Sequence, residues 1–128
     1  MLRRAALVLI AGSLVALAGC RSAPVYNIVE APVMSPRGAS MQEVERAILQ
    51  AGAALGWQMV SNRPGHMVGT LLLRDHRAIV DIDYTPKVYS IRYRDSSGLD
   101  YGGGQIHKNY NGWIQNLDRE IRTRLAAA

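Results

Sequence analysis

The chain has little cysteine: Cys20 is the only one among 128 residues. A single thiol cannot close a disulfide within the chain, so the fold depends on its hydrophobic core rather than on covalent cross-links. It also cannot form a cysteine metal site, which needs several thiolates. Internal repeats and low-complexity tracts are absent as well, and this excludes solenoid and fibrous architectures.

The sequence also lacks a long hydrophobic run. Its longest apolar stretch, Ala5 to Gly19, has fifteen residues, whereas a transmembrane helix needs about 20. Arg3 and Arg4 precede the stretch and small residues end it, which is the layout of a secretory signal peptide. A core helix of a cytosolic domain is the other interpretation, but apolar residues cover every face of this stretch. We therefore expect residues 1–19 to be a signal peptide.

The stretch ends in Leu17-Ala18-Gly19-Cys20, which resembles a bacterial lipobox at all four positions. The resemblance implies that Cys20 carries a diacylglyceryl group on its sulfur, that the chain is cut before it, and that the new amine is acylated. Several acyl chains hold a protein stably on a membrane, whereas one holds it only marginally. The lipidated sulfur would also be lost to thiol catalysis.

Arg21 follows the lipobox, where enteric-type sorting uses aspartate for retention in the inner membrane. The resemblance therefore favours the outer over the inner membrane, with the protein facing the periplasm of the bacterial cell envelope. Strong charge is lacking too: removing residues 1–19 takes away Arg3 and Arg4, which lowers the formal net charge from +5 to +3. We expect no nucleic-acid partner, and a mildly basic surface suits anionic headgroups.

Prolines and small residues mark the segment after Cys20. Pro24, Pro32, Pro36 and Gly38 favour an extended linker, so residues 20–39 are interpreted as a lipidated N-terminus and flexible tether. Residues 26–29 could instead form a short edge strand that docks on the domain. Residues 40–128 then form a single domain, large enough to stand on one core.

Capping and alternation predict the elements of this domain. A capping box, Ser40-Met41-Gln42-Glu43, opens a helix at 41–55, with Leu55 among its inward residues. Alternating and apolar stretches predict strands, and the last helix shows one apolar stripe. The architecture is α+β, in the order α-β-β-β-β-α: an antiparallel meander of three to four strands with two helices packed on one face. The strands are expected at 57–60, 66–73, 78–84 and 88–94, a loop at 95–104, and the last helix at 106–125.

Alternation also predicts the two faces of the meander. Val80, Ile82 and Tyr84 share one face and match Tyr89, Ile91 and Tyr93 across a turn. The other face is charged, with Asp81 opposite Arg92 in the simplest register. This second, wet face is made of Asp81, Asp83, Arg92 and Arg94.

The C-terminal third resembles a group of small, uncharacterised proteobacterial envelope lipoproteins. The resemblance is carried by Tyr89-Ser90-Ile91-Arg92-Tyr93, Asp95-Ser96, Ile106-His107, Tyr110-Asn111, Trp113-Ile114 and Leu117. In general plan it extends over about residues 40–125. It implies no activity, cofactor or catalytic residue.

The densest polar chemistry lies at the predicted loop and the start of the last helix. The candidate ligand or partner residues are Asp95, Asp100, Tyr101, His107, Lys108 and Asn109. A glycine-rich loop before a helix can bind an anion through free amides, so a small anionic or glycan ligand is one interpretation. A plain strand-to-helix connection, with asparagines capping and Tyr101 covering the core, is the other.

Catalytic and metal chemistry find little support. A serine triad needs Ser96 or Ser97, His107 and an aspartate held rigidly, yet these lie in one short loop. His66, His76 and His107 lack ligand spacing, so we expect no metal, no cofactor and no catalytic residue. We expect a non-enzymatic binding or accessory module with an envelope protein partner. Cell-wall glycan or anion binding is the alternative, and a hydrolytic enzyme a further one.

Overall fold

A computed structural model describes residues 21–128. The expected signal peptide, residues 1–19, and the expected lipidation site, Cys20, lie outside the described residues. The described chain contains two helices and seven strands. In chain order these are β1 (Ser22–Pro24), β2 (Ile28–Pro32), α2 (Met41–Ala54), β3 (Gln58–Arg63), β4 (His66–Leu73), β5 (His76–Tyr84), β6 (Val88–Ser97), β7 (Gln105–His107) and α3 (Lys108–Ala126).

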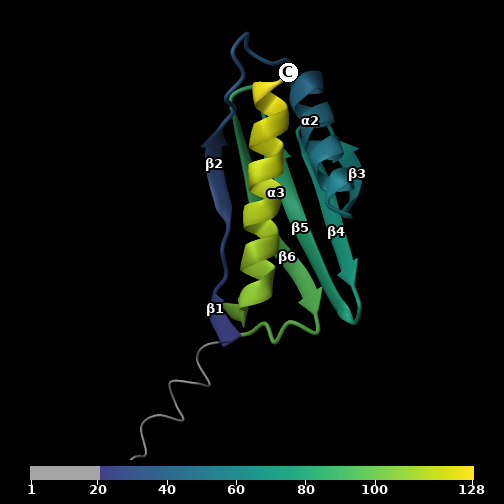
Figure 1. Ribbon diagram of the computed structural model, residues 1–128, viewed down its shortest axis with the longest axis vertical. Helices are drawn as coiled ribbons and strands as arrows, with labels where there is room; N and C mark the ends of the chain where they lie inside the picture. The colour runs from purple at the N-terminus through teal and green to yellow at the C-terminus, as the bar shows by residue number, and fades with distance from the viewer. Residues whose placement is uncertain (1–20) are drawn as a thin grey trace, which may run out of the picture.

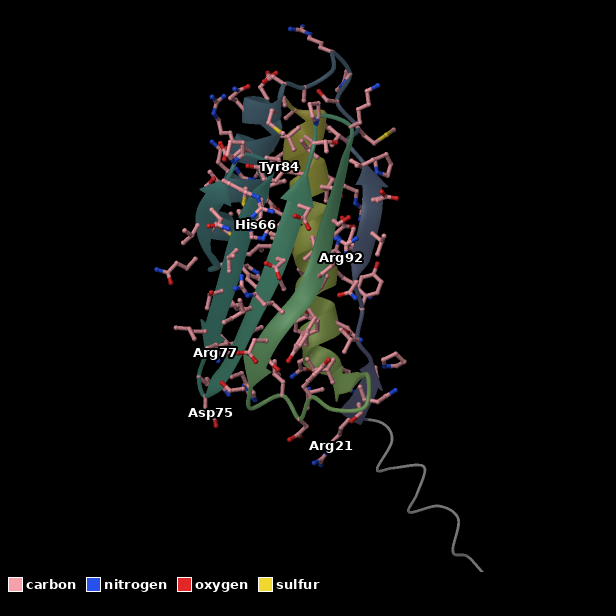
Figure 2. All side chains as sticks on the ribbon, turned by 180° about the vertical axis from the view of Figure 1, so that it is seen from behind. Arg21, His66, Asp75, Arg77, Tyr84 and Arg92 are labelled. Carbon is pink, nitrogen blue, oxygen red and sulfur yellow. The ribbon has the colours of Figure 1, made fainter. Side chains whose placement is uncertain are left out.

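The fold is α+β, as predicted, with more strands than expected. Five antiparallel strands form the main sheet in the order β2-β6-β5-β4-β3, and β1 pairs with β7 in a small second sheet. Both helices lie on the same face of the main sheet (Figure 1), and the view from behind shows the opposite face free of helices (Figure 2). The predicted number of three to four strands was too low, because the N-terminal segment adds β1 and β2 and residues 105–107 add β7.

The meander has the predicted register. Tyr84 pairs with Tyr89, Ile82 with Ile91, and Val80 with Tyr93. The alternating apolar residues face the helices, and the hydrophobic core forms between helices and sheet. Its fully buried members include Val44, Ile48, Met67, Val80, Ile82, Ile91, Ile114, Leu117, Ile121 and Leu125.

The segment expected to be a flexible tether is largely folded. β2 pairs antiparallel with β6, with Ile28 opposite Ile91, and Ile28 is buried in the core. Two of the three prolines that favoured a linker, Pro24 and Pro32, stand at the ends of β1 and β2, where a missing N–H is tolerated. The alternative expectation, a short edge strand, agrees with β2. The folded unit therefore includes residues 22–32 and does not begin at Ser40.

Asn111 of α3 fastens this N-terminal segment to the domain. Its side-chain oxygen accepts a hydrogen bond from the backbone N–H of Tyr26 (3.0 Å), and its amide nitrogen donates to the carbonyl of Pro24 (2.8 Å). The N–H of Val25 donates to the carbonyl of Gly104 (3.0 Å). These bonds satisfy backbone groups of Pro24, at the end of β1, and of Val25 and Tyr26, which follow it.

The helix boundaries follow local capping. Ser40 accepts from the backbone N–H of Glu43 (3.1 Å) and Glu43 accepts in return from that of Ser40 (2.9 Å), so the predicted capping box is confirmed. The bond from the Ser40 N–H, and next the Ser40 side chain, favour the charged carboxylate of Glu43 and lower its pKa. Leu55, expected to face inward, is 38% exposed because the helix ends at Ala54. α3 begins at Lys108 rather than at 106 because the preceding residues belong to β7.

Two tyrosines of the sheet are hydrogen-bonded to carboxylates of the helices. The Tyr89 hydroxyl donates to Asp118 of α3 (2.6 Å), and the Tyr84 hydroxyl donates to Glu45 of α2 (2.8 Å). Burial and the bond to Asp118 raise the pKa of Tyr89. Hydrogen bonds from Tyr84 and then Ser61 lower the pKa of Glu45, since they favour its charged form. Beside the apolar core, α3 is thus held to the main sheet by the bond to Asp118, and α2 by two bonds to Glu45, from Tyr84 and from Ser61 of β3.

Candidate functional site

The candidate residues between 95 and 109 are distributed over a strand, a loop and a helix start. β6 runs to Ser97, so Asp95 lies on a strand and not in the predicted loop. It forms an ion pair across the strands with Arg77 (3.2 Å). The neighbouring Ser96 hydroxyl is hydrogen-bonded to the Tyr93 hydroxyl (2.8 Å). Both side chains therefore have structural partners.

Tyr101 forms the most prominent feature of the loop proper. Its ring stacks on that of Tyr93, with centroids 4.1 Å apart and planes inclined by 15°. Half of Tyr101 is exposed, so it does not close over the core as the plain-connection interpretation expected. Residues 93–101 line a surface hollow of about 420 Å³ beside this pair. Asp100, with a φ of +52°, belongs to its rim.

His107 caps the last helix. Its ring Nδ1 accepts a hydrogen bond from the backbone N–H of Asn109 (3.2 Å). The backbone N–H of His107 donates to the carbonyl of Leu99 (2.9 Å). Lys108 and Asn109 are exposed on the first turn of α3. The cap occupies one of the free amides that an anion at this helix start would use. The structure thus places His107 and Asn109 in a helix cap and not around a site for an anion.

The residues of the conceivable serine triad are not joined by hydrogen bonds. Ser96 is bonded to Tyr93, Asp95 to Arg77, and His107 to the backbone of Asn109. A triad requires the nucleophile, the base and the carboxylate to be bonded in series. In the described residues that series is not formed at this site.

The face of the sheet that the helices leave uncovered carries the expected charged residues. Asp81 lies opposite Arg92, as predicted. The ion pairs, however, run diagonally: Arg92 contacts Asp83 (3.4 Å), and Arg94 contacts Asp81 (3.2 Å). All four side chains are at least 31% exposed. We call these four residues, Asp81, Asp83, Arg92 and Arg94, the charged face.

His66 was missed as part of this surface. Its Nε2 lies 2.8 Å from the Asp81 carboxylate and its Nδ1 3.2 Å from the side-chain amide of Asn62. His66 is only 8% exposed. The hairpin register could have predicted this contact. Pairing of Leu73 with His76 places His66 opposite Asp83, and Asp81 is then its diagonal neighbour on the same face.

An apolar strip lies beside the charged face. Val60, Val68 and Ile79 come from three neighbouring strands and line one hollow together with Thr70 and Arg94. Val60 is 58% exposed on the edge strand β3. The uncovered face thus combines a charged half and an apolar half.

Within residues 21–128, no group of three or more histidine, cysteine or acidic side chains is placed to hold a metal ion. In the same range, no helix is long and apolar enough to cross a membrane. Comparison with family models, with curated proteins and with solved structures finds no match.

Proposed function

We propose that the chain is a lipid-anchored lipoprotein of the bacterial cell envelope, held through Cys20 and facing the periplasm. One observation carries the proposal: Leu17-Ala18-Gly19-Cys20 directly follows a basic start and an apolar run of signal-peptide length. The lone cysteine is compatible with this, since lipidation would leave the mature chain without a free thiol. Arg21 favours the outer membrane over the inner.

The folded part acts in this proposal as a non-enzymatic binding or accessory module for an envelope protein. Two surfaces support that role. The uncovered sheet face carries the charged face and the apolar strip side by side, a combination that suits a protein partner. The edge strand β3 has exposed residues at all but one position, and an exposed edge can pair with a strand from another chain.

The lipid anchor is tested by expressing the full chain in a bacterium with radiolabelled palmitate and measuring the mass of the N-terminal peptide. We expect a labelled protein whose first residue is a triacylated Cys20. Cys20→Ser should abolish the label, whereas the control Ser22→Ala should keep it. A wild-type chain without lipid, or label retained by Cys20→Ser, contradicts the proposal.

The partner is tested by crosslinking in intact cells, followed by purification in detergent. An accessory subunit should return one protein in a stoichiometric complex, and Val60→Asp should reduce its recovery because a charge is placed in the apolar strip. Leu55→Asp, also at an exposed apolar residue but away from the strip, is the matched control. Full recovery with both variants would exclude the strip as the contact.

A second candidate function is binding of cell-wall glycan by the 95–109 region. The supporting observation is the half-exposed Tyr101, stacked on Tyr93 beside a hollow rimmed by Asp95 and Asp100, since an aromatic ring with nearby acids suits a sugar face. Purified sacculi should retain the protein and lose it with Tyr101→Ala. Tyr26→Ala, which removes another exposed tyrosine, should leave binding unchanged. Equal binding of both variants would contradict a glycan site here.

A further inference from the structure

The tip of the β4–β5 hairpin exposes two adjacent leucines. Leu72 is 65% exposed and Leu73 is 47% exposed, directly before the turn at Arg74 and Asp75. Successive residues of a strand point to opposite faces. A partner lying on one face of the sheet would therefore cover only one of the two leucines. A surface that contacts the hairpin from its end would instead cover both Leu72 and Leu73.

The same end of the molecule carries the start of the described chain. Figure 2 shows the labelled Arg21 and Asp75 at one end of the long axis. The 98–104 loop connects them: a Cβ at Gly98 would lie 2.6 Å from the Asp75 carbonyl, and Gly104 is bonded to Val25, just beyond β1. The C-terminus lies at the opposite end, beside the start of α2 (Figure 1).

The distance between this end and the lipid is short. Ser22 already pairs with His107, and Cys20 precedes Ser22 by two residues, which span at most about 7 Å. The long flexible tether expected from the prolines is replaced by strands. The anchor therefore has too little free chain to hold the domain away from the surface.

Charge at this end weakly favours an anionic surface. Arg21, Arg74 and Lys108 are exposed, and none of them forms an ion pair within residues 21–128. Asp75 and Asp100 lie at the same end and offset part of this charge. The leucine tip, rather than electrostatic attraction, is thus the main feature that a bilayer would recognise.

We propose that this end, defined by Arg21, Leu72, Leu73, Arg74, Tyr101 and Lys108, rests on the lipid bilayer, with the leucine tip between the headgroups. The inference rests on the proposed lipidation of Cys20. The domain then stands upright, and α3 with its nineteen residues places the C-terminal end about 28 Å further out. The charged face and the apolar strip remain open to the side. Tyr101 would face lipid in this arrangement, which disfavours the glycan site.

The test uses an environment-sensitive fluorophore on a single introduced thiol. Leu72→Cys, Leu73→Cys and, at the far end, Arg37→Cys are expressed as full chains, purified as lipoproteins and bound to preformed vesicles of phosphatidylethanolamine and phosphatidylglycerol. Lipidated Cys20 has no thiol to compete for the label. Val60→Cys, at an exposed apolar residue of similar accessibility but within β3, is the matched control.

We expect the labels at 72 and 73 to be quenched by spin-labelled lipid and to resist aqueous iodide about threefold better than those at 37 and 60. Equal iodide access at all four positions, in a protein whose N-terminal mass shows the lipid, overturns the upright placement and leaves the lipoprotein proposal intact. Shielding at 60 as strong as at 72 overturns it in favour of a sheet face lying on the bilayer. A purified chain without lipid mass overturns both proposals together.

Discussion

The two faces of the main sheet are made by the same strands and yet have opposite characters. On β5, Val80 and Ile82 are fully buried beneath the helices, while Asp81 and Asp83, which alternate with them along the strand, face away from the helices. A strand alternates its side chains between the faces, so each residue belongs to one face only. The fully buried apolar side chains of β5 therefore lie on the helix-covered face, and the uncovered face carries the charged face and the apolar strip.

The largest expected difference between the faces is in packing. Ile82→Ala removes a fully buried side chain and should lower the free energy of unfolding by about 2–5 kcal/mol. Ile79→Ala makes the same change on the uncovered face, where the side chain is only partly buried, and should cost about 1 kcal/mol. Urea unfolding followed by circular dichroism measures both. Equal losses would show that the uncovered face also stabilises the fold through packing.

A smaller effect is expected at the polar contacts beneath the helices. Tyr89→Phe removes the 2.6 Å bond to Asp118, whose side chain is only 14% exposed, and should cost about 2 kcal/mol. Tyr110→Phe is the matched control because the buried Tyr110 hydroxyl has no hydrogen-bond partner among residues 21–128. Its loss should leave the thermal midpoint unchanged or slightly raised. A large loss in Tyr110→Phe would indicate a partner for that hydroxyl.

The smallest effect is expected on the charged face. Arg92→Gln breaks the pair with Asp83, in which both side chains are nearly half exposed, and should change the unfolding free energy by less than about 0.5 kcal/mol. The same variant should reduce recovery of a crosslinked partner if that partner contacts the charged face, whereas Arg92→Lys should retain part of it. A stability loss above about 1 kcal/mol would make the ion pair structural.

Patterns of local origin were predicted well. Alternation along β5 and β6 fixed the register, including Asp81 opposite Arg92, because a one-residue slip would move every apolar side chain out of the core. The capping box at Ser40 and the apolar stripe of α3 follow from contacts three or four residues apart. These features depend on neighbours that the sequence itself displays.

Features set by distant contacts were not predicted. The pairing of β1 with β7 joins residues more than eighty positions apart, and the prolines of the N-terminal segment pointed to a linker. The cap by His107 depends on the helix beginning at Lys108, whereas the sequence pattern places residues 106 and 107 in the helix; only the pairing with β1 makes them part of a strand. The diagonal pairing of His66 with Asp81 depends on the register of the β4–β5 hairpin, in which Leu73 pairs with His76.

The hydrogen bonds of Asn111 have a mechanical consequence. A pull applied at Arg21 loads the three residue pairs between β1 and β7, the bond from Val25 to Gly104 and the two Asn111 bonds before it loads β2. If these bonds yield, the six residues from Ser22 to Asn27 straighten to about 20 Å, while Ile28 keeps β2 seated in the core. The segment from Ser22 to Asn27 would then extend under tension. The distance between Arg21 and β2 would increase while the rest of the domain stays folded.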